Sequence, residues 1–383
     1  MPEGWKVVAL GDITVDQRIG TTRRGMNGGA SLPLLKMGNV LWGGLDLANI
    51  EPIDEAYALA DGAILEAGDI LFNTRNTPEL VGKTAFWPAP FDAAFDNNLM
   101  RIRLNSTVDS RLVAAWMGSA VGQSAIGQFV CASTSVGAVY WRDLSNLEVP
   151  LPPLTEQRLI AEVLDTWDDA INTAAAIAAK YSIIYRETVL ASVRGAKSCH
   201  LEDVADIQPC DSSLGIKDVM RSGSPMFTAG GVAGLYEPAR HTGAAVILSA
   251  IGAQCGKCFF ADGRWTAGAN TVVIAARQPW ARFLYHYLEI VRPWLIQGSG
   301  QPYISPANAR RTPVPDIDDA DVTRVAATLD ALSSASEQAS GRLYALRRQK
   351  RGLMQKLLSG EWRLPLVGRA FAPSAADQLE DSE

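Results

Sequence analysis

Residues 150–195 read PLPPLTEQRLIAEVLDTWDDAINTAAAIAAKYSIIYRETVLASVRG, and this stretch decides the fold. Its prolines keep residues 150–153 extended, Thr155 is a favourable N-cap, and Glu156 puts negative charge in the first helical turn. Apolar and small residues then step by four and three without a break, at Ile160, Leu164, Trp167, Ile171, Ala174, Ala178, Tyr181, Tyr185, Thr188 and Ser192. This heptad seam predicts one coiled-coil helix about 57 Å long.

The same heptad pattern returns 165 residues later, counted from Ile160 to Val325. Leu164-Asp165 recurs as Leu329-Asp330, and a proline-rich approach and a terminal glycine accompany both helices. The second seam consists of Val325, Leu329, Leu332, Ser336, Ala339, Leu343, Leu346, Lys350, Leu353 and Leu357. The chain is therefore predicted to be a tandem repeat.

The segments between the helices repeat as well. Short β-type runs separated by Gly, Asn, Asp and Pro make both segments β-rich. Lys83 corresponds to Lys257, Asn98 to Asn270 and Tyr140 to Tyr303 in the repeat. We expect an α+β fold with two β-rich domains in tandem and two long helices that form an antiparallel intramolecular coiled coil with a pseudo-two-fold repeat. The expected boundaries are 1–153 and 196–316 for the domains, 154–195 and 317–361 for the helices, and 362–383 for a disordered acidic tail.

Composition describes an ordinary soluble protein of more than one domain. The 383 residues are 48% hydrophobic and 20% charged, and the net charge of −6 disfavours a simple basic nucleic-acid binder. Residues 1–154 carry 11 Lys and Arg against 16 Asp and Glu, whereas residues 196–316 carry 11 against 9. The sequence contains no apolar run long enough to predict a membrane span, and its N-terminus does not predict a signal peptide. The scattered cysteines fit a reducing cytoplasm.

The sequence offers little enzymatic chemistry. Its three histidines form no HExxH or HxE motif, and GxSxG and GxxxxGK[ST] are missing, so no catalytic residue is assigned. Cys255-Gly-Lys-Cys258 could be half of a zinc site, completed by Cys199, Cys210 or His241. Its repeat counterpart is Val81-Gly-Lys-Thr84, which holds no metal ligands. We therefore interpret the shared element as a Gly-Lys turn and predict no metal site.

Two similar modules held at a fixed spacing would suit a duplex with two separated sites along one axis. Arg and Lys hold phosphates or read guanine, and Asn and Gln pair with adenine. Such residues on predicted turns, together with one aromatic, are the DNA-contact candidates: Arg23, Arg24, Asn73, Arg75, Asn76, Lys83, Asn98, Gln254, Lys257, Asn270, Gln301 and Tyr303. Each one, taken singly, is more often solvated surface or a turn-former than a residue that reads a base.

Three segments carry a resemblance to a known family. They are the opening PEGWKVVALGDI, the run AGDILFNTRN followed by VGKTAFW, and above all PLPPLTEQRLIAEVLDTWD. With PMFTAGGVAGLYE and the ending LMQKLLSGEWRL, these resemble the specificity subunit of type I restriction–modification systems, over residues 2 to about 364. The second helix entry, PVPDIDDADVTRV, departs from the family's Pro-Pro-Leu-x-Glu-Gln pattern.

The resemblance implies two target recognition domains, each reading one half of a bipartite, asymmetric DNA site, with the helices setting the unread spacer. It implies a non-catalytic subunit that acts in defence against foreign DNA. The partners would be double-stranded DNA, two methyltransferase subunits that bind S-adenosylmethionine, and restriction/translocase subunits that use ATP. No cofactor is expected in this chain.

A second apolar stripe lies beside the first seam and could dock the methyltransferase subunits, or pack under the domains. It comprises Leu159, Val163, Ala170, Ile177 and Ile184. Two other functions stay open: a specificity subunit of a fused restriction–methyltransferase that cuts on both sides of its site, and a coiled-coil scaffold that joins two proteins without touching DNA.

Overall fold

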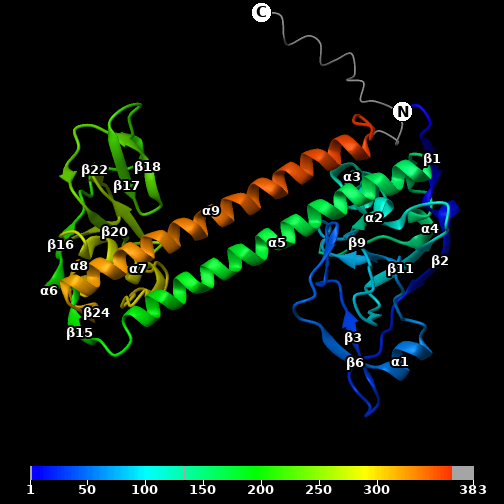
Figure 1. Cartoon of the computed structure of the whole chain (residues 1–383), viewed down its shortest axis with the longest axis horizontal. Helices are drawn as coiled ribbons and strands as arrows, with labels where there is room; N and C mark the ends of the chain where they lie inside the picture. The colour runs from blue at the N-terminus through cyan, green and yellow to red at the C-terminus, as the bar shows by residue number, and fades with distance from the viewer. Residues whose placement is uncertain (1, 133–134, 365–383) are drawn as a thin grey trace, which may run out of the picture. The chain divides into compact units, whose positions relative to one another are not determined.

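The computed structural model describes residues 2–132 and 135–364. The chain divides into two compact units (Figure 1). The first unit comprises residues 1–171 and 345–383, and the second comprises residues 172–344. Each unit therefore contains one β-rich domain together with adjoining stretches of both long helices. In the described part of the chain, none of the helices is long and apolar enough to cross a membrane.

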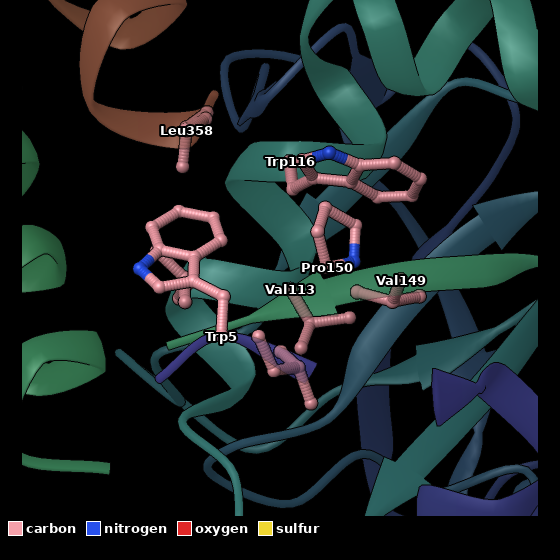
Figure 2. A pocket seen from close by; sticks show the side chains of 8 residues that line it. Trp5, Val113, Trp116, Val149, Pro150 and Leu358 are labelled. Atoms are coloured by element: carbon pink, nitrogen blue, oxygen red, sulfur yellow. The ribbon is translucent and has the colours of Figure 1, made fainter. Parts of the chain in front are cut away.

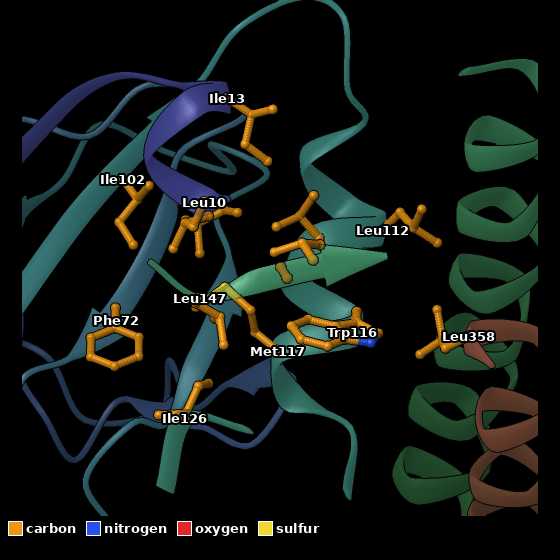
Figure 3. Close-up of a cluster of buried hydrophobic side chains, with 14 of the residues drawn as sticks. Leu10, Ile13, Phe72, Ile102, Leu112, Trp116, Met117, Ile126, Leu147 and Leu358 are labelled. Carbon is orange, nitrogen blue, oxygen red and sulfur yellow. The ribbon is translucent and has the colours of Figure 1, made fainter. Parts of the chain in front are cut away.

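The first unit is built on an antiparallel sheet in the order β2-β11-β7-β9. Its strands are β2 (Thr14–Ile19), β11 (Leu99–Leu104), β7 (Ile70–Asn73) and β9 (Thr84–Phe86). Side chains alternate between the two faces of a strand. Ile70 and Phe72 of β7 therefore join the cluster under the helices (Figure 3), whereas Leu71 joins a second cluster on the opposite face. Because both faces are covered, the first three residues of β7, Ile70 to Phe72, are all apolar, and only the terminal Asn73 is polar.

A smaller sheet, β10-β3-β6, covers that second face, with β10 parallel to β3. The domain begins and ends in one antiparallel pair, β1 with β14. The remaining elements of the first unit are β10 (Ala94–Phe95), β3 (Ser31–Leu35), β6 (Glu51–Asp54), β1 (Lys6–Ala9), β14 (Glu148–Leu151), η1 (Leu10–Ile13), β4 (Val40–Leu41), β5 (Gly44–Leu45), α1 (Glu55–Ala60), β8 (Arg75–Asn76), β12 (Cys131–Ala132), β13 (Gly137–Ala138), α2 (Ser110–Gly118), α3 (Ala120–Gly127) and α4 (Trp141–Leu144).

The second unit repeats the main sheet and the closing pair of this plan, and its smaller sheet has one strand more. Its main sheet runs β16-β23-β20-β21, its smaller sheet β18-β17-β22-β19 with β17 parallel to β22, and its closing pair is β15 with β24. The elements are β16 (Asp206–Pro209), β23 (Thr271–Ala275), β20 (Ala245–Ser249), β21 (Cys258–Ala261), β18 (Gly231–Tyr236), β17 (Ser224–Thr228), β22 (Arg264–Ala267), β19 (His241–Thr242), β15 (Lys197–His200), β24 (Pro313–Asp316), α6 (Leu201–Val204), η2 (Ile216–Asp218), α7 (Trp280–Val291) and α8 (Pro306–Arg310).

Backbone hydrogen bonds fix the register of the repeat. The Asn73 N–H donates to the Lys83 oxygen, and the Ser249 N–H donates to the Lys257 oxygen. The predicted pairing of Lys83 with Lys257 is therefore confirmed. The pairing of Tyr140 with Tyr303 is wrong, because Tyr140 precedes α4 as Ser305 precedes α8. Ile251 corresponds to Arg75 in the repeat. Because Ile251 forms a β-bridge with Tyr303 and Arg75 pairs with Ala138, the counterpart of Tyr303 is Ala138.

The two long helices are α5 (Leu154–Ser192) and α9 (Asp319–Leu358). Helix α5 begins one residue before Thr155, so Thr155 lies inside the first turn rather than at the N-cap. In the first unit, Lys350 of α9 pairs with Asp168 of α5 at 2.5 Å. In the second unit, Tyr185 of α5 lies close to Ser333 of α9, whose side chain opposes the rise in the pKa of Tyr185 that burial causes. The early part of one helix thus lies beside the late part of the other, as an antiparallel pair requires.

Burial along the predicted seams is greatest where a domain covers the helices. Ile160, Leu164, Leu329 and Leu357 are at most 3% exposed. At the middle of α5 the small seam residues Ala174 and Ala178 are 7% and 9% exposed, whereas the larger Tyr181 is 37% exposed. Half-buried seam residues are Trp167, Ile171, Val325, Leu332, Leu343, Leu346 and Leu353. A two-helix coil buries only one narrow face, which explains this gradient.

Glycines with positive φ end both long helices: Gly195 has φ +79° and Gly360 has φ +73°. A Cβ at Gly360 would collide with the ring of Pro2. Beyond it, the Arg363 guanidinium donates to the Glu3 carbonyl oxygen at 3.0 Å. Residues 360–363 therefore lie against residues 2–3 within the first unit.

Candidate nucleic-acid interface

In each unit, three loops meet where the main sheet ends, and we call each set a loop cluster. The first cluster comprises residues 74–83, 96–98 and 137–139, and the second comprises residues 250–257, 268–270 and 297–304. Equivalent hydrogen bonds join them: the Thr74 N–H donates to the Asn98 oxygen, and the Ala250 N–H donates to the Asn270 oxygen, both at 2.9 Å. Most of the predicted DNA-contact residues lie in or beside these clusters.

Three predicted asparagines hold the first cluster together. Asn73 is fully buried, its Nδ2 donates to the Asn98 carbonyl oxygen at 3.3 Å, and its Oδ1 accepts from Asn76 Nδ2 at 3.0 Å. Asn98 Nδ2 donates to Asp96 at 3.2 Å. The Asn73 amide therefore forms its hydrogen bonds within the protein, as buried polar groups require, and the structure gives no support to the prediction that Asn73 contacts DNA. The side-chain amides of Asn76 and Asn98 likewise donate hydrogen bonds within the protein.

Arg24 is also committed within the protein. Its Nη2 donates to Asp96 at 3.1 Å and to Asn97 at 2.9 Å, and its Nη1 donates to two backbone oxygens. Burial raises the pKa of Asp96, and the Asn98 N–H and the Arg24 guanidinium oppose that shift. The guanidinium of Arg23 lies 3.5 Å from Asp61 and over the ring of Tyr57. The first arginine is thus the freer of the two.

Arg75 and Lys83 present cationic side chains at the first cluster. Arg75 is exposed and Lys83 is half-buried, and neither has an ion-pair partner among residues 2–132 and 135–364. In the second cluster Gln254 and Gln301 are exposed, and Tyr303 is 41% exposed. The Lys257 ammonium lies 5.4 Å from the centre of the Phe259 ring. Asn270 has φ +64°, a conformation that asparagine tolerates, so it forms the turn.

Lys217 was missed by the sequence reasoning. The Ala269 N–H donates to the Leu214 oxygen, just as the Asn97 N–H donates to the Thr21 oxygen. Lys217 therefore occupies the position of Arg24, three residues further on, and it is exposed. The two loops share no sequence motif, so only this backbone register identifies the correspondence.

The two Gly-Lys turns are built alike. Gly82 and Gly256 both have φ +89°, in the region that favours glycine. The Thr84 hydroxyl donates to the Gly82 oxygen at 2.9 Å, and Cys258 Sγ lies 4.0 Å from the Gly256 oxygen. Burial raises the pKa of the Cys258 thiol well above its ordinary value. Among the described residues, no group of three His, Cys, Asp or Glu could hold a metal ion.

Each domain is attached to a long helix at an equivalent aspartate. Arg111 of α2 pairs with Asp165 of α5 at 2.8 Å, and Arg282 of α7 pairs with Asp330 of α9 at 3.2 Å. The start of α5 adds a buried amide: Gln157 accepts from the Asp109 N–H and donates to the Pro152 oxygen. The corresponding residue of α9 is Val322, which is fully buried. An apolar contact therefore replaces the polar one where the second helix entry departs from the first.

The predicted docking stripe divides into two parts. Leu159 and Val163 are half-buried, and Val163 packs against the core of the first unit. Ile177 and Ile184 are 46% and 39% exposed. Only the second part is therefore open to a partner in this chain.

The crevice drawn in Figure 2 is part of the first unit's core. It is lined by Trp5, Val113, Trp116 and Leu358, among others, and leaves no room for a water molecule. The Trp5 indole N–H is buried there without an acceptor among the described residues. The crevice is too narrow to hold a substrate.

The comparisons with known proteins concern this same architecture. The family model for the type I restriction modification DNA specificity domain matches residues 2–180. The chain is 23% identical over 171 residues to the type I restriction enzyme EcoKI specificity subunit of Escherichia coli. It is 25% identical over 177 residues to the MjaX specificity subunit of Methanocaldococcus jannaschii. These matches cover 43% and 45% of this chain, and 36% and 41% of the relatives.

Solved structures extend the likeness to the whole fold. The type I restriction–modification S subunit from M. genitalium superposes with a TM-score of 0.65 at 15% identity, over 92% of this chain and 96% of that one. A chain from a structure on assembly and conformational transition of the type I R-M system gives 0.53 at 17% identity, over 94% and 99%. With the repeated domains and paired helices described above, these matches lead to one conclusion: the chain is similar in sequence to type I restriction–modification specificity subunits over residues 2–180, and it shares the fold of their solved structures.

Proposed function

We propose that this chain is a non-catalytic DNA sequence-specificity subunit. Each loop cluster would read one half of a bipartite, asymmetric site, and the helix pair would set the unread spacer. The observation that carries this proposal is the duplication of the loop cluster at the end of the same four-stranded main sheet, with lysines at equivalent positions in Lys83 and Lys257. A two-part reader needs two such surfaces, whereas a scaffold without DNA contact has no need of them.

The proposed partners are those implied by the similarity to specificity subunits. The exposed part of the stripe on α5, which contains Ile177 and Ile184, would dock methyltransferase subunits. Those subunits would bind S-adenosylmethionine and modify the DNA, and restriction subunits would use ATP. The positive charge needed to hold DNA would be shared with them, because this chain carries a net charge of −6.

Methylation mapping tests the proposed function. Genomic DNA from cells with and without this chain, both containing active methyltransferase partners, is sequenced for modified bases. We expect one bipartite methylated motif that disappears when the chain is removed. If no motif is lost, and the purified complex gives no salt-dependent, sequence-selective DNA shift, the chain is a scaffold instead.

The two turn lysines should contribute to affinity rather than to sequence choice. We expect Lys83→Ala and Lys257→Ala each to weaken DNA binding similarly on cognate and unrelated sequences. Each should also lower the slope of log K against log salt by about one. Titration of the assembled complex with labelled DNA at several salt concentrations measures both quantities.

The chain supplies a matched control pair for this experiment. Lys6 and Lys197 begin β1 and β15, the first strands of the two closing pairs, and both are exposed. Lys6→Ala and Lys197→Ala should leave the salt slope unchanged. Equal effects at all four positions would contradict the assignment of the loop clusters.

A further inference from the structure

One buried imidazole joins three helices in the second unit. The Tyr185 hydroxyl of α5 lies 2.7 Å from His286 Nδ1 on α7, and His286 Nε2 lies 3.0 Å from Asp330 Oδ1 on α9. The His286 side chain is 2% exposed. We call this arrangement the Tyr185–His286–Asp330 bridge. It connects the domain's own helix to both long helices at one point.

The partners determine the direction of every hydrogen bond in the bridge. A carboxylate only accepts, so the imidazole carries its proton on Nε2 and donates it to Asp330. Nδ1 then accepts from the Tyr185 hydroxyl. Apolar contacts between helices are non-directional, whereas two short hydrogen bonds to opposite sides of one ring fix distances and angles. A small rotation of α7 against the long helices would break one of them.

The first unit does not contain such a bridge among its described residues. At the positions that correspond to Tyr185 and Ser333 in the repeat, Lys350 and Asp168 form an ion pair between α9 and α5 alone. The Asp168 side chain is 46% exposed, and ion pairs that reach the solvent constrain geometry weakly. An ion pair between the domain helix and a long helix occurs in both units, as Arg111–Asp165 and as Arg282–Asp330. The second unit therefore differs by its additional hydrogen bonds through the His286 imidazole.

We infer that the Tyr185–His286–Asp330 bridge positions the domain of residues 196–316 on its helices, and thereby sets the spacer length at which the second half-site is accepted. This inference rests on the proposed function. Tyr185, His286 and Asp330 are positioning residues, because they lie in the helix junction and not in the loop clusters.

The bridge should respond to mild acid. Burial lowers the pKa of His286, and Asp330 opposes that shift, so the imidazole is neutral near pH 7. Protonation would place a second N–H on Nδ1, facing the Tyr185 O–H, and the hydroxyl would have to turn toward Ser333. Because the folded-state pKa is depressed, the contribution of the bridge is present above the ordinary histidine pKa and is lost as the pH falls. The charged and titratable groups around the ring are Tyr185, Arg282, Tyr285, Glu289, Asp330 and Glu337.

Methylation by the complete complex in cells tests the inference. Plasmids carry the mapped motif with its own spacer, or with a spacer one base pair longer or shorter. Tyr185→Phe removes one buried hydrogen bond and keeps the ring, so we expect methylation of the altered spacers to rise about five-fold relative to the native spacer. The bases required in both halves should not change. Tyr344→Phe is the matched control, since Tyr344 is 71% exposed in the same unit.

His286→Gln provides a second, independent readout. Glutamine can still donate to Asp330, but it does not titrate. With the purified complex, the wild type should lose spacer discrimination as the pH falls below 6.5, the ordinary histidine pKa, while His286→Gln should show weak discrimination at every pH. If both variants discriminate spacers as the wild type does, the inference is overturned and the proposed function stands. If the wild type methylates no bipartite motif at all, both the proposed function and this inference are contradicted.

Discussion

Exchanging residues 6–151 for the corresponding segment of another specificity subunit is expected to replace one half of the methylated DNA motif and to leave the other half and the spacer unchanged. The exchanged segment starts in β1 and ends in β14, which pair from Lys6–Leu151 to Ala9–Glu148. The two ends of the exchanged segment therefore lie side by side, and the exchange leaves all residues of α5 and α9 unchanged. Sequencing of modified bases in cells that carry the chimaera measures the result.

The reciprocal exchange is the control. Residues 197–316 are bounded in the same way by β15 and β24, which pair from Lys197–Asp316 to His200–Pro313. That exchange should replace the other half of the motif only. If either chimaera altered both halves while folding normally, the two domains would not read independently and the two-reader interpretation would fail.

The largest effect on stability is expected from Arg363→Ala. The Arg363 guanidinium makes a two-pronged contact with the Glu156 carboxylate, at 2.6 and 2.8 Å, and the Glu156 side chain is 1% exposed. Removing the guanidinium leaves a buried carboxylate without its cation, which costs about 3 kcal/mol of unfolding free energy. Chemical denaturation of the full chain, followed by tryptophan fluorescence, measures the loss.

Glu361→Gln controls for position and charge in this comparison. Glu361 pairs with Lys356 at 3.0 Å, and their side chains are 58% and 41% exposed. A pair in solvent contributes about 0–1 kcal/mol, so this variant should remain close to the wild type. Equal losses in the two variants would mean that the Arg363 contact has no special role.

The long-range plan could be predicted from the sequence because it is encoded by periodicity. The heptad seam from Ile160 and its copy from Val325 specify helices by themselves, and the copied Leu164-Asp165 marks positions that the structure uses twice. The alternation of Ile70, Leu71 and Phe72 between two covered faces gives the continuous apolar run of a buried strand. These patterns depend only on backbone geometry.

The residues of the interface were harder to predict because their roles depend on side-chain direction. Asn73 looked like a base reader in a loop, but it ends a buried strand and points inward. Lys217 had no sequence counterpart and became visible only through the hydrogen bond between Ala269 and Leu214. His286 gave no signal, because a histidine in an apolar helix is identified as a bridge only when Tyr185 and Asp330 lie beside it.

The contact between residues 360–363 and residues 2–3 makes the connectivity of the protein nearly circular. After Gly195 the chain passes through Ala196 into β15. After Gly360 it reaches Arg363, which contacts Glu3, and Glu3 lies shortly before β1. A short peptide from Arg363 to Glu3 would therefore reproduce in the first unit the passage that the second unit already has. A circular permutant joined there and opened after Gly195 should keep both domains and both helices. The order in which the two halves are translated is then independent of the order in which their half-sites lie on DNA.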